Sequence, residues 1–148
     1  MTSSPYCRKC TSTLRCGNYH LYVVELDYEL IKNKKFIKQN PGYKNDMDCL
    51  YVGSTSHTCQ CRFKQHREHA KKRTLGFTCL CDGKEQFREF LRGGGHTRGS
   101  YYPGAYGLRL RPDLFMKYNP IMDQNYAKVM EKKLADMLRS QGYAVWQH

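Results

Sequence analysis

Two short β-strand-like segments constrain the fold more than any other feature of this chain. They are residues 20–24, His-Leu-Tyr-Val-Val, and residues 49–53, Cys-Leu-Tyr-Val-Gly. Each places a tyrosine among β-branched and apolar residues, which favour a pleated strand, and the second ends in a glycine that permits a sharp turn. The stretch between them is basic and holds an Asn-Pro-Gly turn at 40–42. This pattern predicts two antiparallel strands joined by a basic connecting segment.

A helix should follow the second strand. Nothing from Cys59 to Lys72 is glycine or proline, and Thr58 is a suitable N-cap. Arg62, His66 and His69 then recur at i, i+4 and i+7, so they share one helix face. That face is either part of a functional surface or a solvated basic helix edge.

The two strand tyrosines, Tyr22 and Tyr51, can gather with Arg62 and His66 on one surface. This set suits cleavage of a phosphodiester bond. A guanidinium stabilises charge that develops on the phosphate, and a phenol or an imidazole moves a proton.

The charge of the chain favours a polyanionic partner. A chain of 148 residues has the length of a single domain. It contains 25 Lys plus Arg and 13 Asp plus Glu, which give a net charge of +12. Nucleic acid is the leading partner, with ribosome-like packing and an anionic membrane surface as alternatives. The predicted helix and the residue after it supply most of the expected phosphate contacts: Lys64, Arg67, Lys71, Lys72 and Arg73.

Residues 1–19 read as a polar, cysteine-bearing tail. No apolar run approaches the roughly 20 residues that span a bilayer, and the first five residues lack a signal-peptide core, so we expect a soluble, intracellular protein without a membrane partner. Its eight cysteines should then be reduced. Cys7 and Cys10 have the spacing of a zinc knuckle, with Cys16 as a third candidate ligand. The alternative is plain thiols on a small arm.

The clearest predicted helix lies near the C-terminus. Asp123 can cap it, Gly142 marks its end, and a stripe of helical period supplies its apolar face: Ala127, Met130, Leu134, Met137 and Leu138. Glu131 stands at the margin of this stripe, where a carboxylate needs a partner. A divalent cation would be one; the alternative is a solvated Glu131 paired with Lys128 or Lys132. Residues 143–146 read as a final strand.

The segment 74–107 has weaker secondary-structure patterns than the rest of the chain. Phe87, Phe90 and Leu91 predict a short helix ended by the glycines at 93–95, and residues 96–107 read as a loop. Tyr101, Tyr102 and Tyr106 in that loop could stack on unpaired bases or serve as packing residues.

These elements together resemble the GIY-YIG nucleases. Leu21-Tyr22 stands where the family's first motif has Ile-Tyr, and Tyr51-Val52-Gly53 matches the second motif. Arg62-x3-His66 follows at about the family's helix spacing, and Glu131 matches the metal-binding glutamate. The resemblance spans residues 20–146.

The resemblance implies an α+β fold in which a small central three-stranded antiparallel sheet is flanked by helices, with residues 20–148 as the nuclease domain and 1–19 as the tail. It implies a single Mg²⁺ or Mn²⁺ held by Glu131 and the scissile phosphate, while Arg62 stabilises the pentacovalent phosphate. Tyr22 is the favoured general base, with Tyr51 and His66 as alternatives. The implied substrate is DNA, and RNA stays open.

The chain also departs from the family's pattern. His20 replaces the first glycine, and 28 residues separate the two tyrosines, far more than in most members. We therefore expect recognition to come from insertions, the tail or an oligomeric partner. The rival interpretations are a non-catalytic basic nucleic-acid-binding protein, with or without structural Zn²⁺, and a zinc-ribbon-like structural protein.

Overall fold

The fold is built on a mixed four-stranded sheet. The computed structural model describes residues 19–72, 76–79, 86–89 and 101–147. The strands run in the order β5-β1-β2-β6. Their bounds are β1 His20–Leu26, β2 Cys49–Thr55, β5 Gly107–Leu110 and β6 Ala144–Gln147. A separate two-stranded sheet pairs β3 (Gly76–Cys79) with β4 (Gln86–Glu89).

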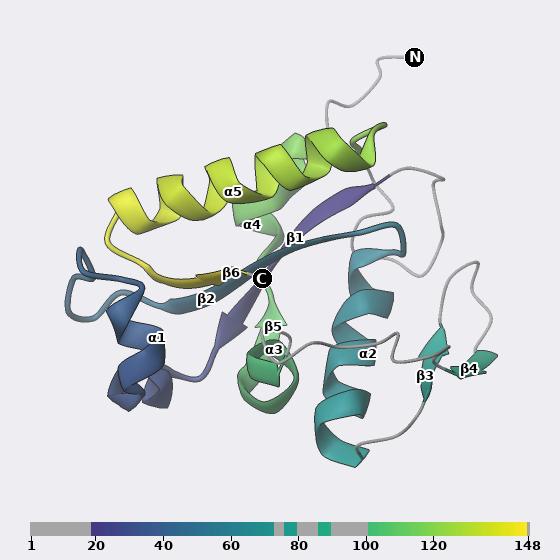
Figure 1. Cartoon of the computed structure of the whole chain (residues 1–148), viewed down its shortest axis with the longest axis horizontal. Coiled ribbons are helices and arrows are strands. Elements are labelled where there is room, and N and C mark those ends of the chain that lie inside the picture. Colours follow the sequence, from purple (N-terminus) through teal and green to yellow (C-terminus); the bar gives the residue numbers. More distant parts are fainter. Residues whose placement is uncertain (1–18, 73–75, 80–85, 90–100, 148) are drawn as a thin grey trace.

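Helices cover both faces of the four-stranded sheet. Figure 1 shows α5 along one side of β1, β2 and β6, with α2 and α3 on the opposite side. The bounds of the three longer elements are α2 Cys59–Lys72, α3 Tyr101–Tyr106 and α5 Gln124–Ser140. The remaining short helices are η1 Tyr28–Lys32, α1 Lys34–Lys38, α4 Pro112–Phe115 and η4 Met116–Tyr118. The α+β class and the flanking helices are confirmed.

The predicted three-stranded antiparallel sheet is wrong. β1 and β2 do pair antiparallel, with Tyr22 opposite Gly53 and Val24 opposite Tyr51. β6 pairs parallel to β2, and β5 adds a fourth strand antiparallel to β1. Parallel pairing joins segments that are distant in sequence, and a local pattern does not specify it. β5 is only four residues long and follows a segment rich in glycine and tyrosine, so its strand signal is weak.

Two predictions between residues 74 and 107 are also wrong. The predicted helix around Phe87 is the strand β4, which pairs with β3. The predicted loop at 96–107 contains the short helix α3 before β5 begins at Gly107. Short apolar runs do not distinguish helix from strand by periodicity alone.

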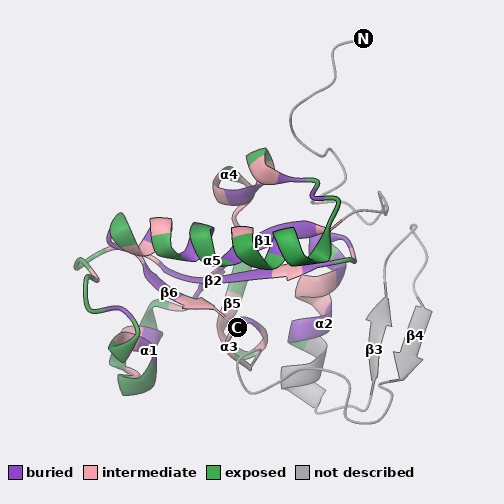
Figure 2. Ribbon diagram, turned by 45° about the horizontal axis from the view of Figure 1, so that its top comes forward, coloured by how far each residue is buried: buried purple, intermediate pink, exposed green. Residues whose placement is uncertain are grey.

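The two long helices begin as the sequence predicts. The Thr58 hydroxyl accepts a hydrogen bond from the Cys61 backbone N–H at 3.1 Å, and the Asp123 side chain caps α5 through the Asn125 N–H at 3.2 Å. Beyond the C-terminal end of α5, Gly142 has φ +101°, a conformation that favours glycine. Figure 2 shows the buried stripe of α5 against the sheet and its exposed face outward. The helix thus supplies the apolar face that covers β1 and β2.

Two buried asparagines close stretches of the sheet that lack a neighbouring strand: the start of β1, beyond its pairing with β5, and the outer edge of β6. The Asn119 side chain exchanges two hydrogen bonds of 2.7 Å with the backbone N–H and C=O of Leu21 in β1. The Asn40 side chain does the same with Val145 in β6, at 2.7 Å to the N–H and 3.1 Å to the C=O. Each amide takes the place of a peptide group on a missing neighbouring strand. The backbone groups of Leu21 and Val145 therefore have hydrogen-bond partners where no strand pairs with them.

Several predicted features lie outside the described residues. These include Cys7, Cys10 and Arg73, as well as the side chains of His69, Lys71 and Lys72. Among the residues described, Cys49, Cys59 and Cys61 are buried thiols. No helix within the described ranges is both long enough and apolar enough to cross a membrane.

Candidate active site

The centre of the candidate site is a hydrogen bond between β1 and α2. The Tyr22 hydroxyl lies 2.7 Å from Nε2 of His66, and both side chains are about 1% exposed. Tyr51 of β2 completes the group. Its ring centroid is 6.0 Å from that of Tyr22 and 5.6 Å from that of His66, which it meets edge-on. The structure thus brings together three of the side chains that the sequence identified.

Gly53 lets the Tyr22 phenol approach β2. A Cβ atom at this position would lie 2.6 Å from the Tyr22 hydroxyl oxygen and 2.7 Å from Cζ, closer than atoms pack. The glycine that ends the second sequence motif is therefore needed for this contact. The sharp turn that the sequence suggested there is wrong, because β2 continues through Gly53 to Thr55. Any larger residue would displace the Tyr22 ring.

Burial reinforces the neutral, protonated state of Tyr22. It raises the pKa of the phenol well above its ordinary value, and the neighbouring Tyr51 adds to the rise; the charge of Arg62 and hydrogen bonding with its guanidinium oppose it. The phenol is therefore neutral near pH 7. A neutral phenol accepts a proton only if it passes its own proton on, and Nε2 of His66 lies within hydrogen-bond distance to receive it.

Arg62 is oriented by a residue that the sequence did not identify. Its Nη1 donates to Oε1 of Gln65 at 3.1 Å, and Nε2 of Gln65 contacts the Cys61 sulfur at 3.2 Å. Gln65 is buried one residue before His66. No sequence signal marks this role, because the burial of Gln65 is known only from the folded chain.

Glu131 is buried rather than marginal. Its side chain is only 2% exposed, and the Ser54 hydroxyl donates to its Oε2 at 2.7 Å. Burial raises the pKa of Glu131; the hydrogen bond from Ser54, the charge of Lys128 and the hydrogen bond with Gln147 oppose the rise. Lys132 pairs instead with Asp136 at 2.9 Å. Of the alternative, a solvated Glu131 paired with Lys128 or Lys132, the solvated state and the Lys132 pair are wrong, whereas the charge of Lys128 does act on Glu131.

Glu131 and the tyrosine group lie on opposite faces of the sheet. Side chains alternate along a strand, so Ser54 points away from the face that carries Tyr51 and receives the Tyr22 phenol at Gly53. Glu131 contacts Ser54 from α5, whereas His66 contacts Tyr22 from α2. The two groups nonetheless reach β2 at consecutive residues, Gly53 and Ser54. The sequence resemblance did not reveal this separation.

The surroundings of Glu131 fit a hard divalent cation. A carboxylate, a hydroxyl and an amide group occur together there, on Glu131, Ser54 and Gln147, and oxygen atoms of these kinds are ligands of Mg²⁺ and Mn²⁺. Burial disfavours the ionised form of this carboxyl, and a bound cation would add to the charge of Lys128 in favouring it. Across the described ranges, no three or more His, Cys, Asp or Glu side chains cluster as a metal site. Protein ligands for such an ion would thus centre on Glu131.

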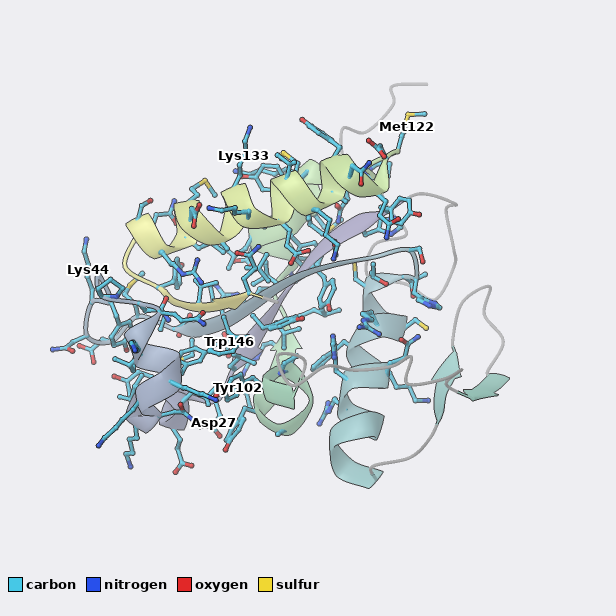
Figure 3. The ribbon with its side chains drawn as sticks, in the orientation of Figure 1. Asp27, Lys44, Tyr102, Met122, Lys133 and Trp146 are labelled. Atoms are coloured by element: carbon cyan, nitrogen blue, oxygen red, sulfur yellow. The ribbon has the colours of Figure 1, made fainter. Side chains whose placement is uncertain are left out.

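Tyr102 packs rather than presenting a free ring. Its ring centroid lies 4.7 Å from that of Trp146 and 5.8 Å from that of Phe36. Figure 3 shows Tyr102 and Trp146 side by side beneath the sheet. Of the two interpretations of this tyrosine, packing is confirmed.

Comparison with known proteins finds no matching family model, and neither a curated protein nor a solved structure is significantly similar to this chain.

Proposed function

We propose that this protein is a divalent-metal-dependent endonuclease that hydrolyses phosphodiester bonds in DNA. The observation that carries the proposal is the buried hydrogen bond between Tyr22 and His66, with Tyr51 against both rings and Arg62 acting on Tyr22. A buried proton-transfer pair beside a guanidinium is costly to maintain and has a direct use in phosphoryl transfer. The resemblance of the same residues to the GIY-YIG nucleases supports this reading.

The proton path follows from the geometry. A water molecule that attacks the phosphorus gives its proton to the Tyr22 oxygen, while the Tyr22 hydroxyl gives its own proton to Nε2 of His66. Tyr22 is thereby neutral before and after the step, as its raised pKa requires. His66 ends the step as the imidazolium. Tyr51 holds both rings in place from the neighbouring strand.

The remaining charges act on the phosphate. Arg62, oriented by Gln65, stabilises the negative charge that develops on the phosphate oxygens. Glu131, with Ser54 and Gln147, would hold the divalent cation, on the face of the sheet opposite Tyr22. The chemistry that such an ion would supply is Lewis-acid stabilisation of a leaving oxygen.

The test is cleavage of supercoiled plasmid with and without Mg²⁺. Arg62→Ala should lower the cleavage rate by about 10²–10³ because one aligned donor to a developing charge contributes that much. Lys133→Ala removes one positive charge from the exposed face of α5 and should leave the rate unchanged. Cleavage by Arg62→Ala within tenfold of the wild-type rate would remove Arg62 from the site.

The second candidate is a basic nucleic-acid-binding protein without catalysis. The observation that favours it is the position of Glu131 across the sheet from Tyr22. Tight binding of DNA without cleavage in either Mg²⁺ or Mn²⁺ would support this candidate and contradict the nuclease.

A further inference from the structure

A surface groove lies between α2 and β5, away from the Tyr22–His66 pair. Its volume is about 390 Å³, within the range of small-ligand sites. Three apolar and three cationic side chains line most of it: Phe63, Leu108, Leu110, Lys64, Arg67 and Arg109. No carboxylate occurs among the described residues that line it. The groove therefore combines an apolar floor with positive charge.

One helix presents both the groove and the candidate active site. Successive residues of an α-helix are about 100° apart, so Phe63, Lys64 and Arg67 lie on a different side of α2 from Arg62 and His66. With side chains, a helix is about 10–12 Å across, roughly three steps of a stacked nucleic-acid strand. A strand bound at Arg62 could thus reach the groove within a few nucleotides.

The groove contains a platform of the kind that stacks on bases. The Arg67 guanidinium lies over the Phe63 ring, 5.4 Å from its centroid, and Leu108 beside them is 47% exposed. An exposed leucine next to an aromatic ring and a planar cation leaves apolar area for a flat ligand. The apolar part of the groove therefore suits a nucleobase.

The cations suit the phosphate of the same nucleotide. Arg109 forms an ion pair with Glu25 at 3.3 Å, but its side chain is 66% exposed and can still face an anion. Lys64 and Arg67 add two charges from the helix side. A paired duplex could contact this groove only through its sugar-phosphate backbone, because the faces of its bases are stacked inside the helix. The apolar side chains of the groove would then contact no base.

From this charge complementarity and shape, we propose that the groove binds one unpaired nucleotide of the nucleic-acid strand. The base contacts Phe63, Arg67 and Leu108, and the phosphate contacts Lys64 and Arg109. The proposal rests on the proposed function in that it names the substrate class: nucleic acid with a single-stranded or extrahelical segment near the cleaved bond.

The experiment measures binding without divalent cation, by fluorescence anisotropy of a labelled oligothymidylate and of a blunt duplex of equal length. Leu108→Glu places an acid in the groove at an exposed position, and Arg67→Gln removes one groove charge. Both should weaken oligothymidylate binding about tenfold or more, the effect of losing one base–aromatic stack. Duplex binding should weaken no more than with Lys133→Gln, which removes one charge from the exposed face of α5. Melting temperatures confirm that all three variants fold.

Equal weakening of oligothymidylate and duplex binding by Leu108→Glu would overturn the proposal, since the groove would then act only through charge. Competition by poly-glutamate as strong as by unlabelled oligothymidylate would also overturn it and point to an acidic protein partner. The binding assay needs no cleavage. A chain that shows the unpaired-strand preference but cuts nothing contradicts the nuclease alone, and a chain that cuts without the preference contradicts the groove alone.

Discussion

Gly53→Ala tests the packing on which the candidate site depends. The added Cβ would lie 2.6 Å from the Tyr22 oxygen, whereas ordinary contacts begin at 3.4 Å, so the phenol must move by about 0.8 Å. Tyr22 is held by Tyr51 and His66 and is only 1% exposed, so the shift cannot be absorbed by solvent. A movement of that size can lengthen the 2.7 Å hydrogen bond to His66 to as much as about 3.5 Å, beyond useful length.

The expected cost is both structural and functional. Overpacking a core position typically costs about 1–3 kcal/mol, which corresponds to a melting temperature lower by about 2–12 °C for a chain of this size. Misplacement of a reacting group by nearly 1 Å costs about 10²-fold in rate. Thermal unfolding and single-turnover cleavage of DNA measure the two effects separately.

Gly42→Ala is the matched control because it makes the same chemical change where nothing lies within 4 Å of the new Cβ. It should change neither stability nor cleavage beyond small backbone effects. The double variant Gly53→Ala/Tyr22→Phe should cut no more slowly than Tyr22→Phe alone, since both changes disable one hydrogen bond. Wild-type cleavage by Gly53→Ala would refute the reasoning.

Three further predictions concern single side chains. Tyr22→Phe should lower the cleavage rate by about 10²–10⁴, the usual contribution of positioned proton transfer, and Tyr51→Phe should lower it less. Equal cleavage rates for the two variants would mean that the Tyr22–His66 pair has only a structural role. Burial raises the pKa of the Glu131 carboxyl above its ordinary value of 4.5. The contribution of this carboxyl to folding stability is therefore fully present at low pH and is lost as the pH rises through the raised pKa. The melting temperature of Glu131→Gln minus that of the wild type should therefore increase with pH. Mg²⁺ should reduce this difference in melting temperature, because it stabilises the wild type only. A difference in melting temperature that does not change with pH would contradict the burial argument. Asn119→Ala should destabilise the protein by about 2–6 kcal/mol in chemical denaturation, since the N–H and C=O of Leu21 each lose a partner, while Asn125→Ala on the exposed start of α5 should cost far less.

The sequence predicts the parts of the fold that are encoded locally. β1 and β2, the start of α2 and both ends of α5 follow from alternation, helical period and caps within a few residues. The partners of β2 do not, because β6 joins it across about 90 residues and in parallel. The sequence does not predict β5 because its alternating pattern, Leu-Arg-Leu after a glycine, is too short to indicate a strand.

The candidate site is predictable to the same extent. Tyr22, Tyr51 and His66 meet because the strand register and the helix face are both local patterns. The separation of Glu131 follows from strand parity, since Ser54 is one residue beyond Gly53, but its partner on α5 is 77 positions away and only the folded chain identifies it. The raised pKa values have no sequence signal because burial causes them.

The asparagines at the sheet edges also bear on chemical ageing. Asparagine deamidates when the backbone nitrogen of the next residue attacks the side-chain carbonyl, and the aspartate formed here would set a negative oxygen against the carbonyl of Leu21 or Val145. Proline follows in both cases, as Pro41 after Asn40 and Pro120 after Asn119. A proline nitrogen carries no hydrogen and does not complete this reaction. Spontaneous conversion to aspartate should therefore spare both asparagines and fall first on exposed loop positions such as Asn45.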